Sequence, residues 1–148
     1  MLKDPEASNR SQAAKMLGVW GGPENSRLLL DALKDSEFGV RWTALDALKA
    51  IRDPKTAKGL MEYVLARSDD RHKAIEALVA IGPAAEDAVI SGLNHPDVFV
   101  RMDLCNALKV IGTSKSIPAL RGFGRRPPGL DVMAAQQALM QIGARTGR

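Results

Sequence analysis

Apolar and small residues recur along this chain at intervals of three and four, the spacing that places side chains on one face of an α-helix. One pattern, Ala-Leu-x-x-Ile, stands at residues 47–51, 77–81, 107–111 and 138–142, with a weaker copy at 16–20. The leucines of the five copies lie 31, 30, 30 and 31 residues apart, at Leu17, Leu48, Leu78, Leu108 and Leu139. A fixed period of this length predicts an array of similar structural units.

Each unit is predicted to contain two helices. A second amphipathic stretch lies between successive copies, with apolar residues at i and i+4, as in Leu29 and Leu33 or Val89 and Leu93. Glycines follow three copies, where a helix can end, and prolines stand where the next helix can begin; these residues are Gly82, Gly112, Gly143, Pro23, Pro54 and Pro83. Aromatic residues make up only 4% of the chain, and the alternation typical of strands is missing.

The phrase Val-Arg-x-x-Ala-x-x-Ala-Leu-x-x-Ile at residues 40–51, and its counterpart at 100–112, resembles the HEAT repeats in their short bacterial form. The resemblance covers nearly the whole chain. It implies an all-α fold, a right-handed α-α superhelix (a HEAT-like solenoid) of about four and a half helical hairpins. Most members of this family are scaffolds and adaptors, with a few enzymes and bilin lyase-type subunits, so the resemblance indicates architecture more firmly than activity.

We expect a single repeat domain over residues 1–148, with units at 1–22, 23–53, 54–82, 83–113 and 114–148. The first unit is predicted to be half a repeat, because the sequence before Arg10 matches the end of the first helix that precedes Arg41. Its helix would leave apolar atoms uncovered on the outer side. Two arrangements would cover these atoms. One is a homodimer through the N-terminal end, and the alternative is that residues 1–9 fold back over the helix as a lid.

The helical register separates core positions from free ones. Val40, Ala44, Leu48 and Ile51 fall on one face, which should be the core, and Trp20 takes the register of Ile51 and is expected there too. The resemblance implies that the second helices line a concave surface, which meets the partner. The candidate partner-binding residues on that face are Trp42, Asp46, Lys49, His72, Glu76, Met102, Asn106, Lys109 and Met133.

Arginines recur at one repeat position, at Arg10, Arg41, Arg71 and Arg101. They could form a basic row for a phosphate backbone. The interpretation that we favour is structural: they pair with carboxylates in neighbouring turns, for which Glu37, Asp69 and Asp97 are the candidates.

The net charge of +4 is concentrated late in the chain, where seven basic residues and one acidic residue follow Leu104. The plainer interpretation of this basic end is a solubilising surface. The alternative is that a nucleic acid or another polyanion binds there, and its candidate residues are Lys115, Arg121, Arg125 and Arg126.

Catalytic patterns are scarce, and we expect no cofactor and no metal site. The two histidines stand far apart without the spacing of metal ligands, and Cys105 is a single cysteine that is expected to pack inertly. Asp46, His72 and Glu76 could meet on adjacent helices for acid–base work, although a solvated pair is favoured. A lyase-type enzyme subunit therefore stays an alternative that rests on the resemblance alone. No apolar run reaches the length of a membrane span or a signal peptide, so we expect a cytoplasmic protein without a membrane partner.

Overall fold

A computed structural model describes residues 1–67 and 69–147. Within these residues the chain is all-α and contains no strand, as the periodicity predicts. The helices are α1 (Ala7–Trp20), α2 (Ser26–Ala32), α3 (Phe38–Ile51), α4 (Ala57–Ala66), α5 (Arg71–Ile81), α6 (Glu86–Ser91), α7 (Val98–Ile111), α8 (Ile117–Arg121) and α9 (Leu130–Thr146). Short 3-10 turns lead into α2, α4, α6 and α8, and a further one, Gly122–Arg125, follows α8.

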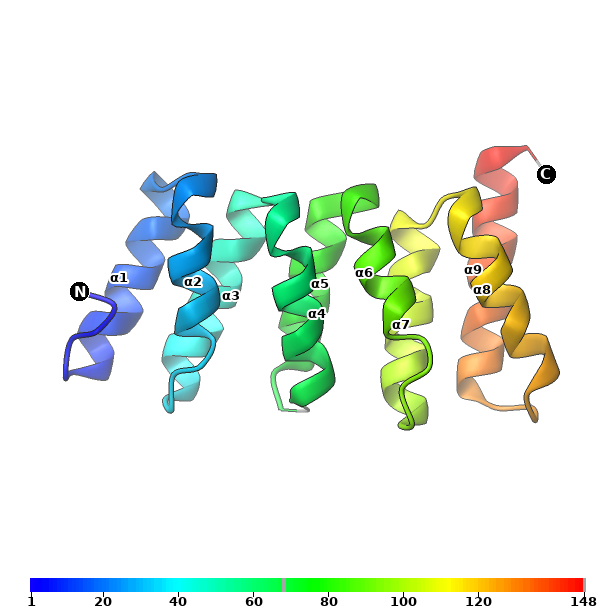
Figure 1. The fold of residues 1–148 in the computed structure, drawn as a ribbon, viewed down its shortest axis with the longest axis horizontal. Coiled ribbons are helices and arrows are strands. Elements are labelled where there is room, and N and C mark those ends of the chain that lie inside the picture. The colour runs from blue at the N-terminus through cyan, green and yellow to red at the C-terminus, as the bar shows by residue number, and fades with distance from the viewer. Residues whose placement is uncertain (68, 148) are drawn as a thin grey trace. The chain divides into compact units, whose positions relative to one another are not determined.

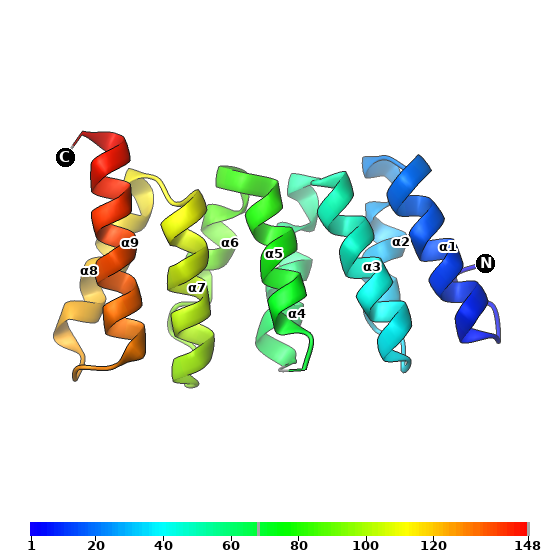
Figure 2. The same cartoon turned by 180° about the vertical axis from the view of Figure 1, so that it is seen from behind.

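The chain forms two compact units, Met1–Ile81 and Gly82–Arg148. In the first unit the longer helices α1, α3 and α5 pack side by side, while α2 lies against α3 and α4 against α5. Figure 1 shows α2 and α4 in front of these longer helices, and Figure 2 shows the same unit from behind. The predicted helical hairpins are therefore present in this unit.

The second unit repeats the arrangement. Helix α7 packs along α9, α6 lies against α7, and α8 lies against α9. In Figure 2, α7 and α9 stand in front of the shorter helices α6 and α8. As in the first unit, the long helices make up one layer and the short helices the other.

Glycines end two of the predicted helices for different reasons. Gly82 has a φ of +83°, a left-handed conformation that a side chain disfavours. At Gly112 a Cβ atom would lie 2.4 Å from the carbonyl oxygen of Leu108, so only glycine fits. The expected end at Gly143 is wrong, because α9 continues through it to Thr146 and is closed by Gly147 with a φ of +71°.

The repeated leucine supplies the core. Leu48, Leu78 and Leu108 are all completely buried. Their counterparts Leu17 and Leu139, in the first and last helices, are only partly buried. The pattern therefore identifies the core, and burial of the repeated leucine is complete in α3, α5 and α7.

Trp20 corrects the predicted core: it is 80% exposed. It is the last residue of α1, whose main packing partner is α3. Val19 and Met16 on the same helix are also exposed, at 63% and 46%. Trp20 stands at the repeat position of Ile51, but this side of α1 has no helix against it in the described structure.

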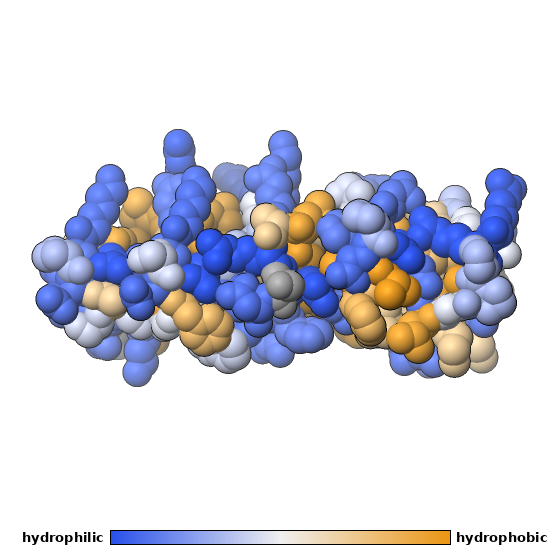
Figure 3. All heavy atoms as spheres, turned by 90° about the horizontal axis from the view of Figure 1, so that it is seen from below, coloured by the Kyte–Doolittle hydropathy of each residue, from blue (hydrophilic) through white to orange (hydrophobic). Residues whose placement is uncertain are grey.

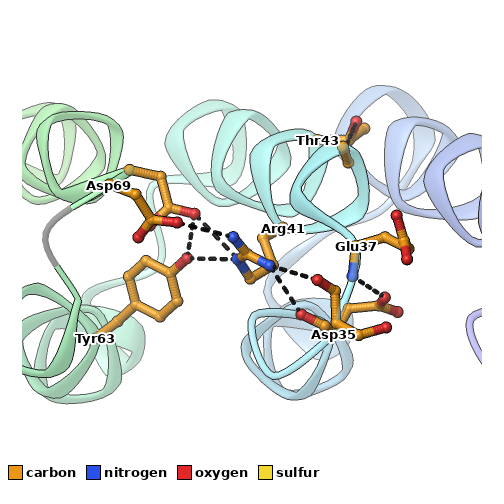
Figure 4. Close-up of polar contacts among 9 residues, drawn as sticks. Asp35, Glu37, Arg41, Thr43, Tyr63 and Asp69 are labelled. Atoms are coloured by element: carbon orange, nitrogen blue, oxygen red, sulfur yellow. Dashed lines mark hydrogen bonds and ion pairs between the residues drawn. The ribbon is translucent and has the colours of Figure 1, made fainter.

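The arginine row has a structural role at Arg10, Arg41 and Arg101. The Arg41 side chain is 5% exposed, and its Nε lies 3.1 Å from Asp70 Oδ2 and 3.2 Å from the Tyr63 hydroxyl. Its Nη2 reaches Asp69 at 3.1 Å, and its Nη1 donates to the carbonyl oxygens of Asp35 and Ser36, which end the turn before α3. Figure 4 shows this guanidinium between the two repeats that it joins.

Two other arginines do the same with carboxylates that differ from those expected. Arg10 binds Asp35 through two hydrogen bonds of 2.7 and 2.9 Å, and Arg101 binds Asp131 at 2.7 Å. The pairing of Asp69 is confirmed, whereas Glu37 and Asp97 are wrong as partners. Asp97 instead caps α7, where it accepts the Phe99 N–H at 2.7 Å. The expected carboxylates did not include Asp35, Asp70 and Asp131, which pair with Arg10, Arg41 and Arg101.

These carboxylates predict a loss of stability in acid. Hydrogen bonding to Arg10 lowers the pKa of Asp35. Burial alone would raise the pKa of Asp131 and Glu86, but Arg101 outweighs it at Asp131, and Ser116 and Thr113 outweigh it at Glu86, so both pKa values are also lowered. A carboxyl whose pKa is lower in the folded state stabilises the fold above its unfolded pKa, and that contribution is lost as the pH falls.

The free energy of unfolding should accordingly be steady from pH 7 to about 5 and decline below that, as the pH passes the ordinary carboxyl pKa of about 4. Urea denaturation at a series of pH values measures it. Asp131→Asn should lower stability at pH 7 and flatten the decline below pH 5. An unchanged slope in that variant would show that Asp131 does not contribute to the acid transition.

Candidate partner-binding face

Trp42 lies on α3 with its ring partly in solvent, 39% exposed. The Phe38 ring, one turn earlier on α3, is 5.0 Å away and tilted by 49°. Lys73 reaches over from α5, with its ammonium nitrogen 4.4 Å from the centre of the indole ring. The same ammonium forms a salt bridge with Asp46 of α3. Cation–π attraction and the salt bridge together hold the exposed ring in one place.

A second ion pair joins the same two helices. Lys49 of α3 and Glu76 of α5 lie 2.7 Å apart, and both side chains are about half exposed. The hydrogen bond lowers the pKa of Glu76 and raises that of Lys49. His72 lies on α5 one turn before Glu76 and is exposed. The first unit thus brings together five of the predicted residues, and we name the surface of Trp42, Asp46, Lys49, His72 and Glu76 the α3–α5 face.

The α3–α5 face offers little for catalysis. Asp46 and Glu76, the two carboxylates of the predicted acid–base group, are each ion-paired to a lysine. Among residues 1–67 and 69–147 no group of three histidine, cysteine or acidic side chains could hold a metal ion. Cys105 is fully buried, and burial raises the pKa of its thiol to about 12. Its position fits the expectation of inert packing.

The remaining predicted partner-binding residues lie on α7 and α9 in the second unit. Met102 and Lys109 are partly exposed and Asn106 is exposed, while Met133 of α9 is 58% exposed. Lys109 Nζ lies 3.4 Å from the side-chain oxygen of Gln137. This surface has methionines and amides where the first unit has ion pairs.

The residues proposed for polyanion binding differ in their availability. Lys115 pairs with Asp87 at 2.6 Å, and Arg126 contacts Asn94 and the Phe123 ring. Arg121 and Arg125 are exposed, and the described structure contains no ion pair for either. Arg145, which is not one of these candidates, donates hydrogen bonds to the carbonyl oxygens of Lys109, Val110 and Gly112 at the end of α7.

A comparison with family models gives two matches to the model for HEAT repeats, one at residues 1–79 and one at residues 66–140. The chain belongs to the HEAT repeat family. A search of curated proteins finds no match. HEAT repeats generally mediate interactions between proteins. In the part of this HEAT-repeat chain that the structure describes, no helix is long and apolar enough to cross a membrane.

Two residues that contact the α3–α5 face were not predicted from the sequence. Lys73 stands where the preceding repeat has Thr43, and nothing in the pattern of one chain marks it as the partner of Trp42. Phe38 lies four residues before Trp42, and this i, i+4 spacing of aromatic residues could have identified the pair. Figure 3 shows the molecule from below: the surface in this view is largely hydrophilic, with hydrophobic residues gathered in separate areas.

Proposed function

We propose that this HEAT-repeat protein is a non-catalytic scaffold or adaptor that binds a protein partner through the α3–α5 face. The observation that carries the proposal is the exposed ring of Trp42, fixed by Lys73 and Asp46. Tryptophan is enriched among the residues that dominate binding energy in protein interfaces. A ring that is already held in place loses little freedom when a partner covers it.

The surroundings of Trp42 suit a protein surface. Charges of both signs surround the ring, from the ion pairs Asp46–Lys73 and Lys49–Glu76. Protein interfaces typically have such a polar rim around an apolar centre. A groove of about 320 Å³ between α1 and α3 is lined by Asp46 together with small residues, which are Gly18, Ala47 and Ala50. Met102, Asn106, Lys109 and Met133 on the second unit are also proposed to bind a protein partner.

Affinity capture followed by a binding measurement tests this function. The purified chain would be used as bait in an extract of its native host, and a protein identified by mass spectrometry would then be titrated calorimetrically. Trp42→Ala is expected to weaken that binding by at least about tenfold, the range of an interface residue that dominates affinity. Its melting temperature should stay close to that of the wild type, since the ring is partly exposed.

Trp20→Ala is the matched control, because Trp20 is also an exposed tryptophan of the first unit but lies off the α3–α5 face. If Trp42→Ala bound the partner as tightly as the wild type while Trp20→Ala bound it more weakly, the interface would lie on α1 and not on the α3–α5 face. Capture of nucleic acid, with an affinity that falls steeply as salt rises, would favour the polyanion alternative. The homodimer through the N-terminal end is a separate proposal, and the exposure of Val19 and Trp20 on α1 supports it.

A further inference from the structure

An apolar groove runs between α8 and α9, helices that lie side by side in Figures 1 and 2. Its volume is about 530 Å³, and Ile117, Pro118, Leu139, Met140 and Gly143 form most of its lining. Met140 is 75% exposed. Leu139 is partly exposed, although the leucines at its repeat position in α3 and α7 are completely buried. Leu139, whose counterparts are covered by core packing, is therefore partly accessible here beside the exposed Met140.

The hairpin around the groove is uniformly cationic at its surface. Over residues 113–147 the basic residues are Lys115, Arg121, Arg125, Arg126 and Arg145, and the acidic residue is Asp131. Asp131 is 4% exposed and bound to Arg101, so it presents no charge to solvent. The described part of this hairpin thus has exposed cations and no exposed carboxylate.

Two of these cations are available to a ligand. Lys115, Arg126 and Arg145 are engaged within the unit, by Asp87, by Asn94 and by the end of α7. Arg121 forms part of the groove wall, and Arg125 follows it by four residues on the same segment. Within the described residues neither forms an ion pair or a side-chain hydrogen bond.

We propose that the α8–α9 groove binds an acidic amphipathic helix of a protein partner. The apolar face of that helix covers Leu139 and Met140, with side chains at i, i+4 and i+7, as in other complexes of a helix in a groove. Its carboxylates pair with Arg121 and Arg125, whose planar guanidinium groups suit this partner. This second site lies in the Gly82–Arg148 unit and does not depend on the α3–α5 face.

A nucleic acid fits the groove less well than an acidic helix. Phosphate-backbone binding draws its affinity from many cationic contacts, and only two free arginines lie here. Proteins that bind single strands stack bases on exposed aromatic rings. The aromatic residue of this hairpin, Phe123, is 3% exposed and lies under Arg126. The apolar lining of the groove would contact the apolar face of a helix, whereas it would make no favourable contact with a phosphate backbone.

The proposal can be tested with a fluorescein-labelled synthetic peptide of 18 or so residues, built from leucine on one helical face and glutamate on the other. Fluorescence anisotropy would measure its affinity for the full chain. The double variant Arg121→Glu with Arg125→Glu is expected to weaken binding by at least about tenfold, because repulsion replaces attraction. Met140→Glu should weaken binding to a similar extent. All three positions are exposed, so circular dichroism should show unchanged folding.

Two controls make the result specific. Arg27→Glu reverses an exposed charge on α2 in the first unit and should leave peptide affinity unchanged. Trp42→Ala should leave it unchanged as well, so failure of this site and failure of the α3–α5 face can be distinguished. A loss of affinity in either control would show that the peptide binds outside the groove and would overturn the proposal.

Other occupants of the groove would be recognised by different results. Equal binding of a peptide with lysine in place of glutamate would refute the charge preference. Displacement of the peptide by an oligothymidylate, without an effect of Met140→Glu, would show a polyanion site. No peptide binding, combined with self-association in sedimentation experiments that Met140→Glu abolishes, would show that a second copy of the chain covers the groove.

Discussion

Truncation of Leu48, Leu78 or Leu108 to alanine is expected to lower the free energy of unfolding by about 2–5 kcal/mol in each case. All three side chains are fully buried, and each lies at the same position of its repeat. Removal of the leucine loses its burial and leaves a cavity that close-packed helices refill only in part. Urea denaturation followed by circular dichroism measures the loss.

Leu139→Ala is the control for this prediction. Leu139 occupies the same repeat position in α9 but is partly exposed, so its truncation removes less buried surface and should cost less. A cost below about 1 kcal/mol at all three inner leucines would mean that the repeat register does not mark the core. A cost at Leu139 equal to theirs would show that the groove beside it is closed in solution.

The fold was predictable because the same sequence pattern occurs several times, and each copy indicates the same core positions. Leu48, Leu78 and Leu108 illustrate this, since they are evenly spaced in the sequence and all three are buried. Trp20 shows the limit of this reasoning. Periodicity tells which side of a helix is apolar, but burial also requires a neighbour on that side, and the sequence pattern of α1 does not contain that information.

The candidate site was predictable in part for a similar reason. Periodicity places Trp42, Asp46 and Lys49 on the side of α3 away from the core, and the structure places them there. The contacts between helices depend on how far long side chains reach, as when Lys73 joins Trp42 to Asp46. The same holds for the arginine row, where the repeat position indicates a structural role, but the partner carboxylate differs from one repeat to the next.

Replacement of Arg41 by methionine is expected to cost about 3–5 kcal/mol, the range found when one member of a buried ion pair is removed. The Asp70 side chain is 0% exposed, and its Oδ1 has no hydrogen-bond partner within residues 1–67 and 69–147. Its Oδ2 accepts the Tyr63 hydroxyl at 2.5 Å and Arg41 Nε at 3.1 Å. Without Arg41 this carboxylate would keep its burial and lose its nearest charge partner.

Arg10→Met and the double variant Arg41→Met with Asp70→Asn separate this explanation from a loss of packing. Arg10 holds the corresponding position in α1, but the side chains of Arg10 and Asp35 are 14% and 12% exposed. Water can therefore solvate the charge left behind, and the cost of Arg10→Met should be smaller.

Asp70→Asn removes the charge that Arg41→Met leaves without a partner, so it should restore part of the lost stability. A double-mutant cycle would measure this effect as coupling between the two positions. If the cycle gave no coupling, the loss would come from the hydrogen bonds that Arg41 donates to the Asp35 and Ser36 carbonyl oxygens, and the guanidinium would stabilise the turn before α3 rather than neutralise Asp70.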